Sequence, residues 1–226
     1  MAQQIIPFTE GINTSYIVKD KGVVIFDAIP FKDPVAYRQN LEQWGIDPKK
    51  IELIILSHGD FDHVGGTKLL KEMTGAKVAI HEHDRLNLEE GIFHWPEGVT
   101  AWGKFSRWLL KPVLKKMWSF SPVPADIILD DNGLSLEEFG IAGKIIFTPG
   151  HTFGSVSVVL DSGDALIGCL AHNRPPFVTK PSLPIYAKDI ELLKNSWKTV
   201  LKQGASTIYP GHGKPFPAEI IHKYIN

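Results

Sequence analysis

Residues 57–66 read SHGDFDHVGG and directly follow the apolar run IELIIL at residues 51–56. The apolar run predicts a buried strand. The six residues 58–63 shortly after it hold four side chains able to bind a metal ion, namely His58, Asp60, Asp62 and His63. Because four side chains cannot all point the same way from a strand or a helix, we expect a tight loop that aims each one separately. The glycines at 65 and 66 then let the chain leave this loop into a helix.

Two further histidines stand in a similar setting later in the chain. His151 lies in TPGHTFGS after the strand-like run GKIIFTPG, and His212 lies in YPGHGKP after the strand-like run STIYPG. A lone histidine after a strand most often serves the turn itself. Three strand ends that each deliver potential ligands instead predict one metal site at the edge of a sheet.

With these three motifs in this order, the chain resembles the metallo-β-lactamase fold superfamily, from Asp27 in VVIFDA to His212. The resemblance implies an α/β fold (α+β), a four-layer αββα sandwich with a one- or two-metal site at the edge of its two sheets. Two positions depart from the family pattern. Asp60 replaces the second histidine of the usual H-x-H-x-D-H, and Cys169 replaces the usual bridging aspartate.

The resemblance also implies a ligand set. It divides the ligands between two ions, the first with His58, Asp60 and His151 and the second with Asp62, His63 and His212, with Cys169 between them or on the second. Three protein ligands with an open position are typical of catalytic zinc. Two zinc ions sharing a hydroxide would supply a nucleophile at neutral pH. Asp62 is then the expected catalytic residue, which orients the hydroxide and accepts its proton.

The identity of the metal stays open at this point. Asp60 adds a hard oxygen, and two histidines with one carboxylate also describe the facial triad of non-haem iron sites, so iron or manganese is an alternative to zinc. The thiolate of Cys169 is a soft ligand and favours zinc.

These features predict a metal-dependent hydrolase that cleaves an ester, thioester, lactone or amide bond of a small substrate. One alternative is a non-haem iron oxygenase of the persulfide dioxygenase type, and another is a metal-binding protein with weak catalysis. A glyoxalase II role is disfavoured because only fourteen residues follow His212. A β-lactamase role is disfavoured because residues 1–11 lack the basic start and apolar core of an export signal.

Three residues are candidates for supporting roles. His172 and Arg174 follow Cys169 by three and five residues, so we expect them to bind an anionic group of the substrate. Asp27 ends a predicted strand, and the resemblance places such an aspartate beside the metal loop as a hydrogen-bond partner.

His81 and His83 stand at a strand end and a helix start with no second ligand set beside them. We therefore place them at the surface or in the layer behind the site.

Composition limits the class of protein. The 226 residues, 43% of them hydrophobic and 22% charged, favour a single domain over residues 1–226. The formal net charge of −1 gives no general attraction to nucleic acid, so no nucleic-acid partner is expected. No apolar run reaches the length of a membrane span. One cysteine cannot form an intramolecular disulfide, which favours a reducing compartment and makes the cytoplasm the expected location.

Residues 91–124 form the least expected part of the chain. They hold four of the six tryptophans, Trp95, Trp102, Trp108 and Trp118, and no Asp or Glu occurs between residues 97 and 126. Two series recur at helical spacing, basic Lys104, Arg107, Lys111 and Lys115 and apolar Phe105, Leu109, Val113 and Met117. We expect a basic amphipathic helix or helix pair, broken at Pro112. We predict that it covers the metal site as a lid. The alternatives are that it packs on the core, binds an acyl-bearing ligand or lipid, or forms a homodimer contact.

The other elements are ordinary. A Lys-Gly turn at residues 21–22 predicts a hairpin, and Asp-Pro at 33–34 begins a helix that extends to residue 44. Residues 188–203 and 217–225 are predicted helices. We assign four short strand-like runs to the second sheet, DIILDD, KIIFTPG, SVSVVLDSG and DALIGCL.

Overall fold

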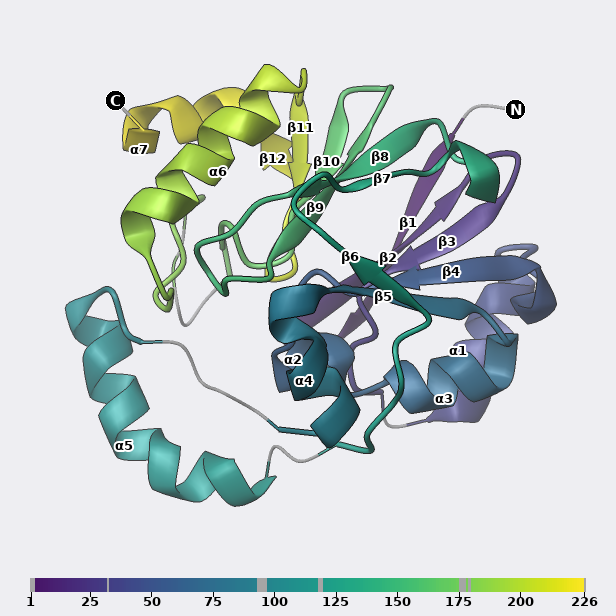
Figure 1. The fold of residues 1–226 in the computed structure, drawn as a ribbon, viewed down its shortest axis with the longest axis horizontal. Helices are drawn as coiled ribbons and strands as arrows, with labels where there is room; N and C mark the ends of the chain where they lie inside the picture. Colours follow the sequence, from purple (N-terminus) through teal and green to yellow (C-terminus); the bar gives the residue numbers. More distant parts are fainter. Residues whose placement is uncertain are drawn as a thin grey trace.

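The computed structural model describes residues 3–31, 33–92, 97–117, 120–174, 178 and 180–225, with only the backbone at 110–117. Two six-stranded sheets lie face to face (Figure 1). The first sheet, in spatial order, contains β1 (Gln4–Glu10), β2 (Asn13–Lys19), β3 (Val23–Phe26), β4 (Ile51–Ile55), β5 (Lys77–His81) and β6 (Ile127–Leu129). The second contains β12 (Phe216–Pro217), β11 (Thr207–Tyr209), β10 (Asp164–Leu166), β9 (Val156–Leu160), β8 (Gly143–Phe147) and β7 (Leu134–Ser135).

Helices cover the outer face of each sheet (Figure 1). The helices are α1 (Pro34–Gln43), α2 (Phe61–Val64), α3 (Thr67–Thr74), α4 (Glu82–Glu90), α5 (Ala101–Met117), α6 (Ile190–Lys202) and α7 (His222–Ile225), with 3-10 turns η1 (Pro48–Lys50), η2 (Glu137–Phe139) and η3 (Ala218–Ile221). Helices α1 and α3 pack on the first sheet, and α6 packs on the second. None of the helices formed by the described residues is both long and apolar enough to cross a membrane.

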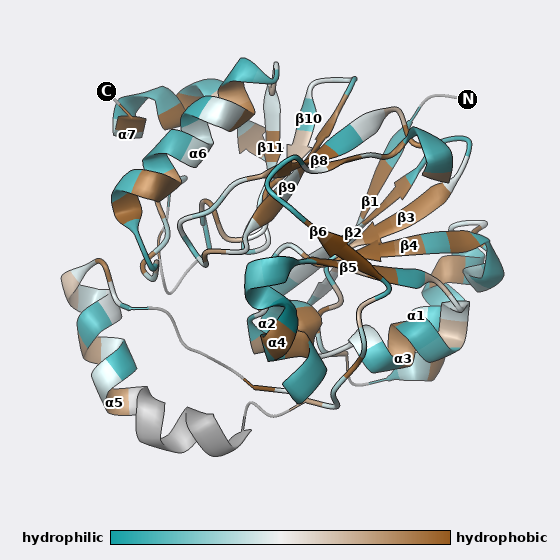
Figure 2. Ribbon diagram, viewed as in Figure 1, coloured by the Kyte–Doolittle hydropathy of each residue, from teal (hydrophilic) through white to brown (hydrophobic). Residues whose placement is uncertain are grey.

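Three apolar layers hold the sandwich together. Strand β4 contributes to two of these layers, because alternate side chains of a strand point to opposite faces. Ile54 packs toward α1 and α3, whereas Leu53 and Ile55 pack between the two sheets. A third layer joins the second sheet to α6 through Leu193 and Trp197. The apolar strands in Figure 2 therefore lie between covered faces, and the predicted four-layer αββα sandwich is confirmed.

The arrangement of strands places the site. β3, β4, β5 and β6 run parallel, so the loops at their carboxyl ends share one edge of the first sheet. Ligands of α/β proteins bind at such an edge. The predicted metal loop follows β4, and Asp27 follows β3 at the same edge. Asp27 has a φ of 67°, a left-handed conformation that Asp tolerates better than most residues.

Several local predictions are confirmed. β2 and β3 form the predicted antiparallel hairpin. Asp33 caps α1 by accepting hydrogen bonds from Val35 N and Ala36 N at 2.9 and 3.1 Å. Helix α6 lies within the predicted range 188–203. The predicted terminal helix at 217–225 is instead a 3-10 turn, η3, followed by the short helix α7.

Two predictions were wrong. The run DIILDD was assigned to the second sheet, but β6 pairs in parallel with β5 in the first. A three-residue apolar strand fits either sheet, and the long connection from β5 permits the parallel pairing. The predicted break at Pro112 is also absent, since α5 continues to Met117. Trp95 and Trp118 lie outside the described residues.

Candidate metal centre

The metal loop and the start of α2 are held by the two residues that follow β3. Ser57 N donates to Asp27 Oδ1 at 2.8 Å, and Ala28 N donates to the His63 carbonyl at 2.8 Å. Asp60 begins α2, but its side chain makes no capping hydrogen bond. The carboxylate of Asp60 is therefore available to the side chains of the site.

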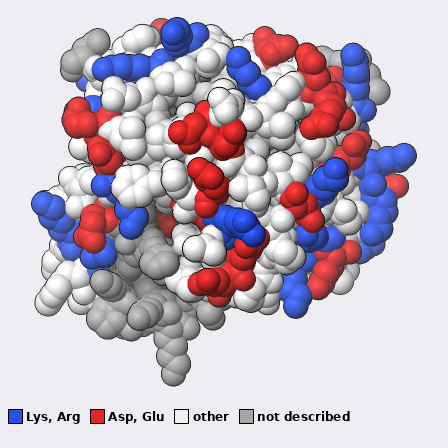
Figure 3. Space-filling view, viewed as in Figure 1, with Lys and Arg blue, Asp and Glu red and all other residues white. Residues whose placement is uncertain are grey.

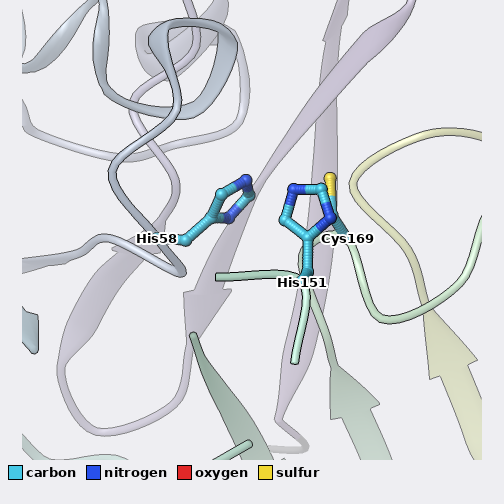
Figure 4. Close-up of side chains that lie close together, drawn as sticks. All are labelled: His58, His151 and Cys169. Atoms are coloured by element: carbon cyan, nitrogen blue, oxygen red, sulfur yellow. The ribbon is translucent and has the colours of Figure 1, made fainter. Parts of the chain in front are cut away.

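The first group of donors is His58, His151 and Cys169, which point toward one another in Figure 4. Their ligand atoms all lie within 4.8 Å of one another. Asp60 Oδ2 lies 3.2 Å from His151 Nε2 and 3.6 Å from His58 Nε2. The aspartate that replaces the usual histidine thus contributes an oxygen to this group.

The second group is His63, Cys169 and His212. His63 Nε2 lies 3.3 Å from His212 Nε2 and 3.1 Å from Cys169 Sγ. Asp62 Oδ2 completes the group, 3.4 Å from His212 Nε2 and 3.8 Å from His63 Nε2. Cys169 belongs to both groups, so all seven predicted ligands meet at one place from the ends of β4, β8, β10 and β11.

The donors fit a metal ion. Among the described residues, the buried atoms His58 Nε2 and Asp60 Oδ1 have no hydrogen-bond partner. Buried polar atoms are rarely left in this state, because each loses its hydration without compensation. Two compact groups of nitrogen, oxygen and sulfur donors satisfy the ligand preferences of zinc, and the thiolate favours zinc over harder ions.

The same residues hold strongly interacting charges. Burial alone would raise the pKa of the Cys169 thiol, but the surrounding imidazoles hold it well below its ordinary value. Burial alone would lower the pKa of His151, but Cys169 and Asp60 raise it to about 10. In the same way, Cys169 and Asp62 raise the pKa of His212 to about 9 against the effect of burial. Metal binding must therefore displace protons from these imidazoles.

Each imidazole ligand is oriented through its second ring nitrogen. Two partners are side chains: His63 Nδ1 lies 2.7 Å from Asp27 Oδ2, and His58 Nδ1 lies 2.8 Å from Ser57 Oγ. Two are backbone carbonyls: His151 Nδ1 lies 2.9 Å from that of Tyr186, and His212 Nδ1 lies 3.1 Å from that of Ile12. Such partners fix the ring and direct Nε2 into the site. The structure thus places Asp27 where the sequence suggested. The two carbonyl partners carry no sequence signal.

Asp84 is a supporting residue that the sequence analysis missed. This buried carboxylate lies in α4, and its Oδ2 accepts from Gly59 N at 2.9 Å and from Thr152 Oγ1 at 2.6 Å. Gly59 lies in the first metal loop, and Thr152 follows His151. Asp84 therefore ties the loop that carries His58 to the loop that carries His151.

We expect Asp84→Ala to weaken metal binding about 10- to 100-fold, because the loops carrying His58 and His151 lose their common anchor. A competition titration against a chromophoric chelator measures this. Asp33→Ala is the matched control, since it also removes a carboxylate that accepts two hydrogen bonds, but in the cap of α1. It should cost about 1 kcal/mol of stability and leave metal affinity unchanged. Equal metal affinity in both variants would contradict the anchoring role.

The two candidate substrate-binding residues differ. His172 is buried, its ring centroid lies 4.7 Å from that of His212, and burial lowers its pKa to about 4. It is therefore uncharged at neutral pH. Arg174 Nη2 donates to the Gly11 carbonyl at 2.6 Å. The predicted contact with an anionic group of the substrate stays a prediction. Since His172 is uncharged, Arg174 is the one of the two residues that could supply a positive charge for it.

His81 serves a helix rather than the metal centre. It is the last residue of β5 and the cap of α4, where its Nδ1 accepts from His83 N at 3.3 Å. The ring proton is then on Nε2, which lies 3.3 Å from Asp131 Oδ1. His81 is buried and His83 is exposed.

The described part of the insert adjoins the site. Val99 N donates to the Ile185 carbonyl at 2.9 Å, and Ser106 Oγ lies 2.6 Å from the hydroxyl of Tyr186. The backbone carbonyl of the same Tyr186 accepts from His151 Nδ1, which links the insert to the site. The apolar residues Phe105 and Leu109 are exposed, so this part of the predicted stripe does not pack on the core. The side chains at 111, 113, 115 and 117 lie outside the described residues.

A two-sheet sandwich with clustered His, Asp and Cys donors at its edge defines a class of metalloproteins. The sequence profile of the metallo-β-lactamase superfamily matches residues 8–212. The chain therefore belongs to the metallo-β-lactamase superfamily, a family of metallo-hydrolases.

Relatives and solved structures agree with this assignment. The chain is 27% identical over 210 residues to a probable metallo-hydrolase of Methanocaldococcus jannaschii, covering 89% of this chain and 88% of that protein. It is 25% identical over 254 residues to a 7,8-dihydropterin-6-methyl-4-(β-D-ribofuranosyl)-aminobenzene-5′-phosphate synthase of the same organism, covering 94% and 84%. The fold matches the BLEG-1 B3 metallo-β-lactamase with a TM-score of 0.70, 21% identity and full coverage of both chains. A metallo-β-lactamase of Cronobacter sakazakii gives a TM-score of 0.64 with 25% identity, over 92% of this chain and 77% of that one.

Proposed function

We propose that this protein is a dinuclear zinc hydrolase that cleaves an ester, thioester, lactone or amide bond of a small substrate. The observation that carries the proposal is the pair of buried donor groups that share Cys169, each with a carboxylate beside it. His58, Asp60 and His151 would hold one ion and Asp62, His63 and His212 the other, with Cys169 between them. Bound zinc would lower the pKa of water to about 7 and polarise the carbonyl of the substrate.

The two carboxylates of the metal loop differ in access. The side chain of Asp62 is 35% exposed, whereas that of Asp60 is 7% exposed. Burial works against the charge of Asp62, but His63 and His212 hold its pKa well below the ordinary value, so it is a carboxylate at neutral pH. An accessible carboxylate beside the donors can orient a water molecule and accept its proton. Asp60 is suited to ligation alone.

The surroundings favour a substrate with an apolar part. Phe153 follows His151 by two residues and is exposed. An exposed aromatic ring two residues from a ligand in the chain is suited to contact an acyl or aryl group of the substrate. Figure 3 shows acidic and basic side chains mixed over the face in view, without a field of one sign among the described residues.

A non-haem iron oxygenase of the persulfide dioxygenase type is the second candidate. His58, His151 and Asp60 are two imidazoles and one carboxylate, the donor set of facial-triad iron sites. Family membership does not by itself fix the reaction, because one relative is named as a synthase.

Metal analysis and substrate assays on one preparation separate the candidates. Protein purified without added metal is expected to contain about two zinc ions per chain and to hydrolyse at least one of a panel of aryl esters, thioesters, lactones and amides. Chelation should abolish the activity, and zinc should restore it. Iron as the bound metal, with oxygen consumption on glutathione persulfide, would support the second candidate. Zinc binding without turnover of any panel member would contradict the proposed hydrolase.

A further inference from the structure

The outer face of α5 is apolar and exposed. Four large side chains, Trp102 (48% exposed), Phe105 (51%), Trp108 (73%) and Leu109 (53%), lie on it. Their spacing places them on one side of the helix. The rings of Trp102 and Phe105 lie 5.9 Å apart, and those of Phe105 and Trp108 lie 6.3 Å apart. We call these four residues the aromatic stripe.

The opposite side of α5 is fixed to the rest of the protein. Gly103 and Ser106 are buried. A Cβ atom on Gly103 would lie 2.3 Å from the Ile185 carbonyl oxygen, so only glycine permits this close approach. Ser106 Oγ lies 2.6 Å from Tyr186 Oη. The helix therefore cannot turn the aromatic stripe inward without losing these contacts, and in Figure 1 α5 lies along the outside of the molecule.

The charge of the segment around α5 indicates what the aromatic stripe would contact. Five of the chain's 24 cations and none of its 25 acids lie between residues 98 and 125, namely Lys104, Arg107, Lys111, Lys115 and Lys116. Removing these five cations from the formal net charge of −1 leaves −6 for the rest of the chain. Lys104 is exposed, and Arg107 pairs with Glu97 at 2.7 Å. By sequence, residues 98–125 thus carry five cations and no acid, one cation being paired with Glu97, while the rest of the chain is acidic in sum.

We propose that α5 binds the surface of a membrane that contains anionic lipids. Helices that lie in the membrane interface combine Trp, Phe and Leu on one face with Lys and Arg beside it. Tryptophan is favoured at the depth of the lipid headgroups, and basic residues are attracted to anionic lipids. The acidic remainder of the chain would be repelled, so α5 would face the lipid. Because Tyr186 contacts both Ser106 and His151, this orientation would hold the metal centre near the membrane.

Vesicle flotation with the metal-loaded full chain tests the proposal without any turnover, so its outcome is independent of the proposed hydrolase activity. Wild-type protein should bind vesicles of phosphatidylcholine with about 30% phosphatidylglycerol, and bind pure phosphatidylcholine vesicles at least about tenfold more weakly. Trp102→Ser combined with Trp108→Ser should reduce binding to the anionic vesicles at least about tenfold. Lys104→Glu should also reduce it.

Matched controls replace exposed residues on other helices. Val35→Ser combined with Leu69→Ser removes two exposed apolar side chains from α1 and α3, and Lys68→Glu reverses an exposed charge on α3. Both should bind like wild type. The proposal is overturned if wild-type protein stays unbound, or if the tryptophan and control variants lose binding equally. Light scattering supplies a second readout. A dimer that dissociates only in the tryptophan variant would assign the stripe to a second copy of the chain and also overturn the proposal.

Discussion

Replacing Asp62 by asparagine is expected to lower kcat/KM of the hydrolase about 10³-fold. The substitution keeps the shape of the side chain but removes the negative charge that His63 and His212 face at 3.8 and 3.4 Å. The variant would lose the proposed proton acceptor, and the second donor group would lose its carboxylate. The fold should be retained, since Asp62 is partly exposed and belongs to none of the three apolar layers.

Steady-state kinetics with metal analysis of the same sample distinguish the two consequences. Asp161→Asn, which neutralises an exposed carboxylate after β9, should keep full activity and metal content. Loss of one metal ion together with activity would identify Asp62 chiefly as a ligand. Retention of both ions with the expected loss of rate would identify it as the proton acceptor. Wild-type activity in Asp62→Asn would refute both roles.

Replacing Asp27 by alanine is expected to have the second largest effect. Its two carboxylate oxygens accept from Ser57 N at 2.8 Å and from His63 Nδ1 at 2.7 Å, and the residue is fully buried. Truncation would leave both donors unpaired, at a cost of about 1–3 kcal/mol each. Alanine would also be strained at the φ of 67°. We expect a loss of about 3–5 kcal/mol in unfolding free energy and about 100-fold weaker metal binding.

Asp27→Asn separates charge from shape. Asparagine also tolerates the left-handed conformation and keeps one oxygen acceptor. Chemical denaturation should therefore show a smaller loss of stability than for alanine, while a metal titration should still show weaker binding, because His63 no longer faces a carboxylate. If Asp27→Asn binds metal like wild type, the charge of Asp27 has no part in tuning His63.

The sequence was informative where side chains carry the chemistry. The motif around His58 and the Pro-Gly-His turns of His151 and His212 predicted donors that the structure brings together. The periodic apolar runs likewise predicted most of the strands. The hydrogen bonds from His151 and His212 go to backbone carbonyls, which any residue possesses, so no sequence signal marks them. Asp84 was missed because its two partners are distant in the sequence and only the fold brings them to it.

The errors have a common physical origin. The three residues of β6 are apolar enough for either sheet, and pairing with β5 is decided by the long-range path of the chain. Pro112 costs a helix one hydrogen bond and crowds the preceding turn, but the 17-residue helix α5 continues through it. In both cases local preference is outweighed by the wider structure.

The donor groups draw on both sheets, since His63 follows β4 in the first sheet and His212 follows β11 in the second. These two residues are 149 positions apart in the chain, and the structure brings their rings into contact. A bound ion would therefore close a very long loop, as a disulfide does, and disfavour every state in which the sheets part at this edge. Proteases cleave such opened states. The supply of metal would thus determine how long each copy of the protein survives in the cell.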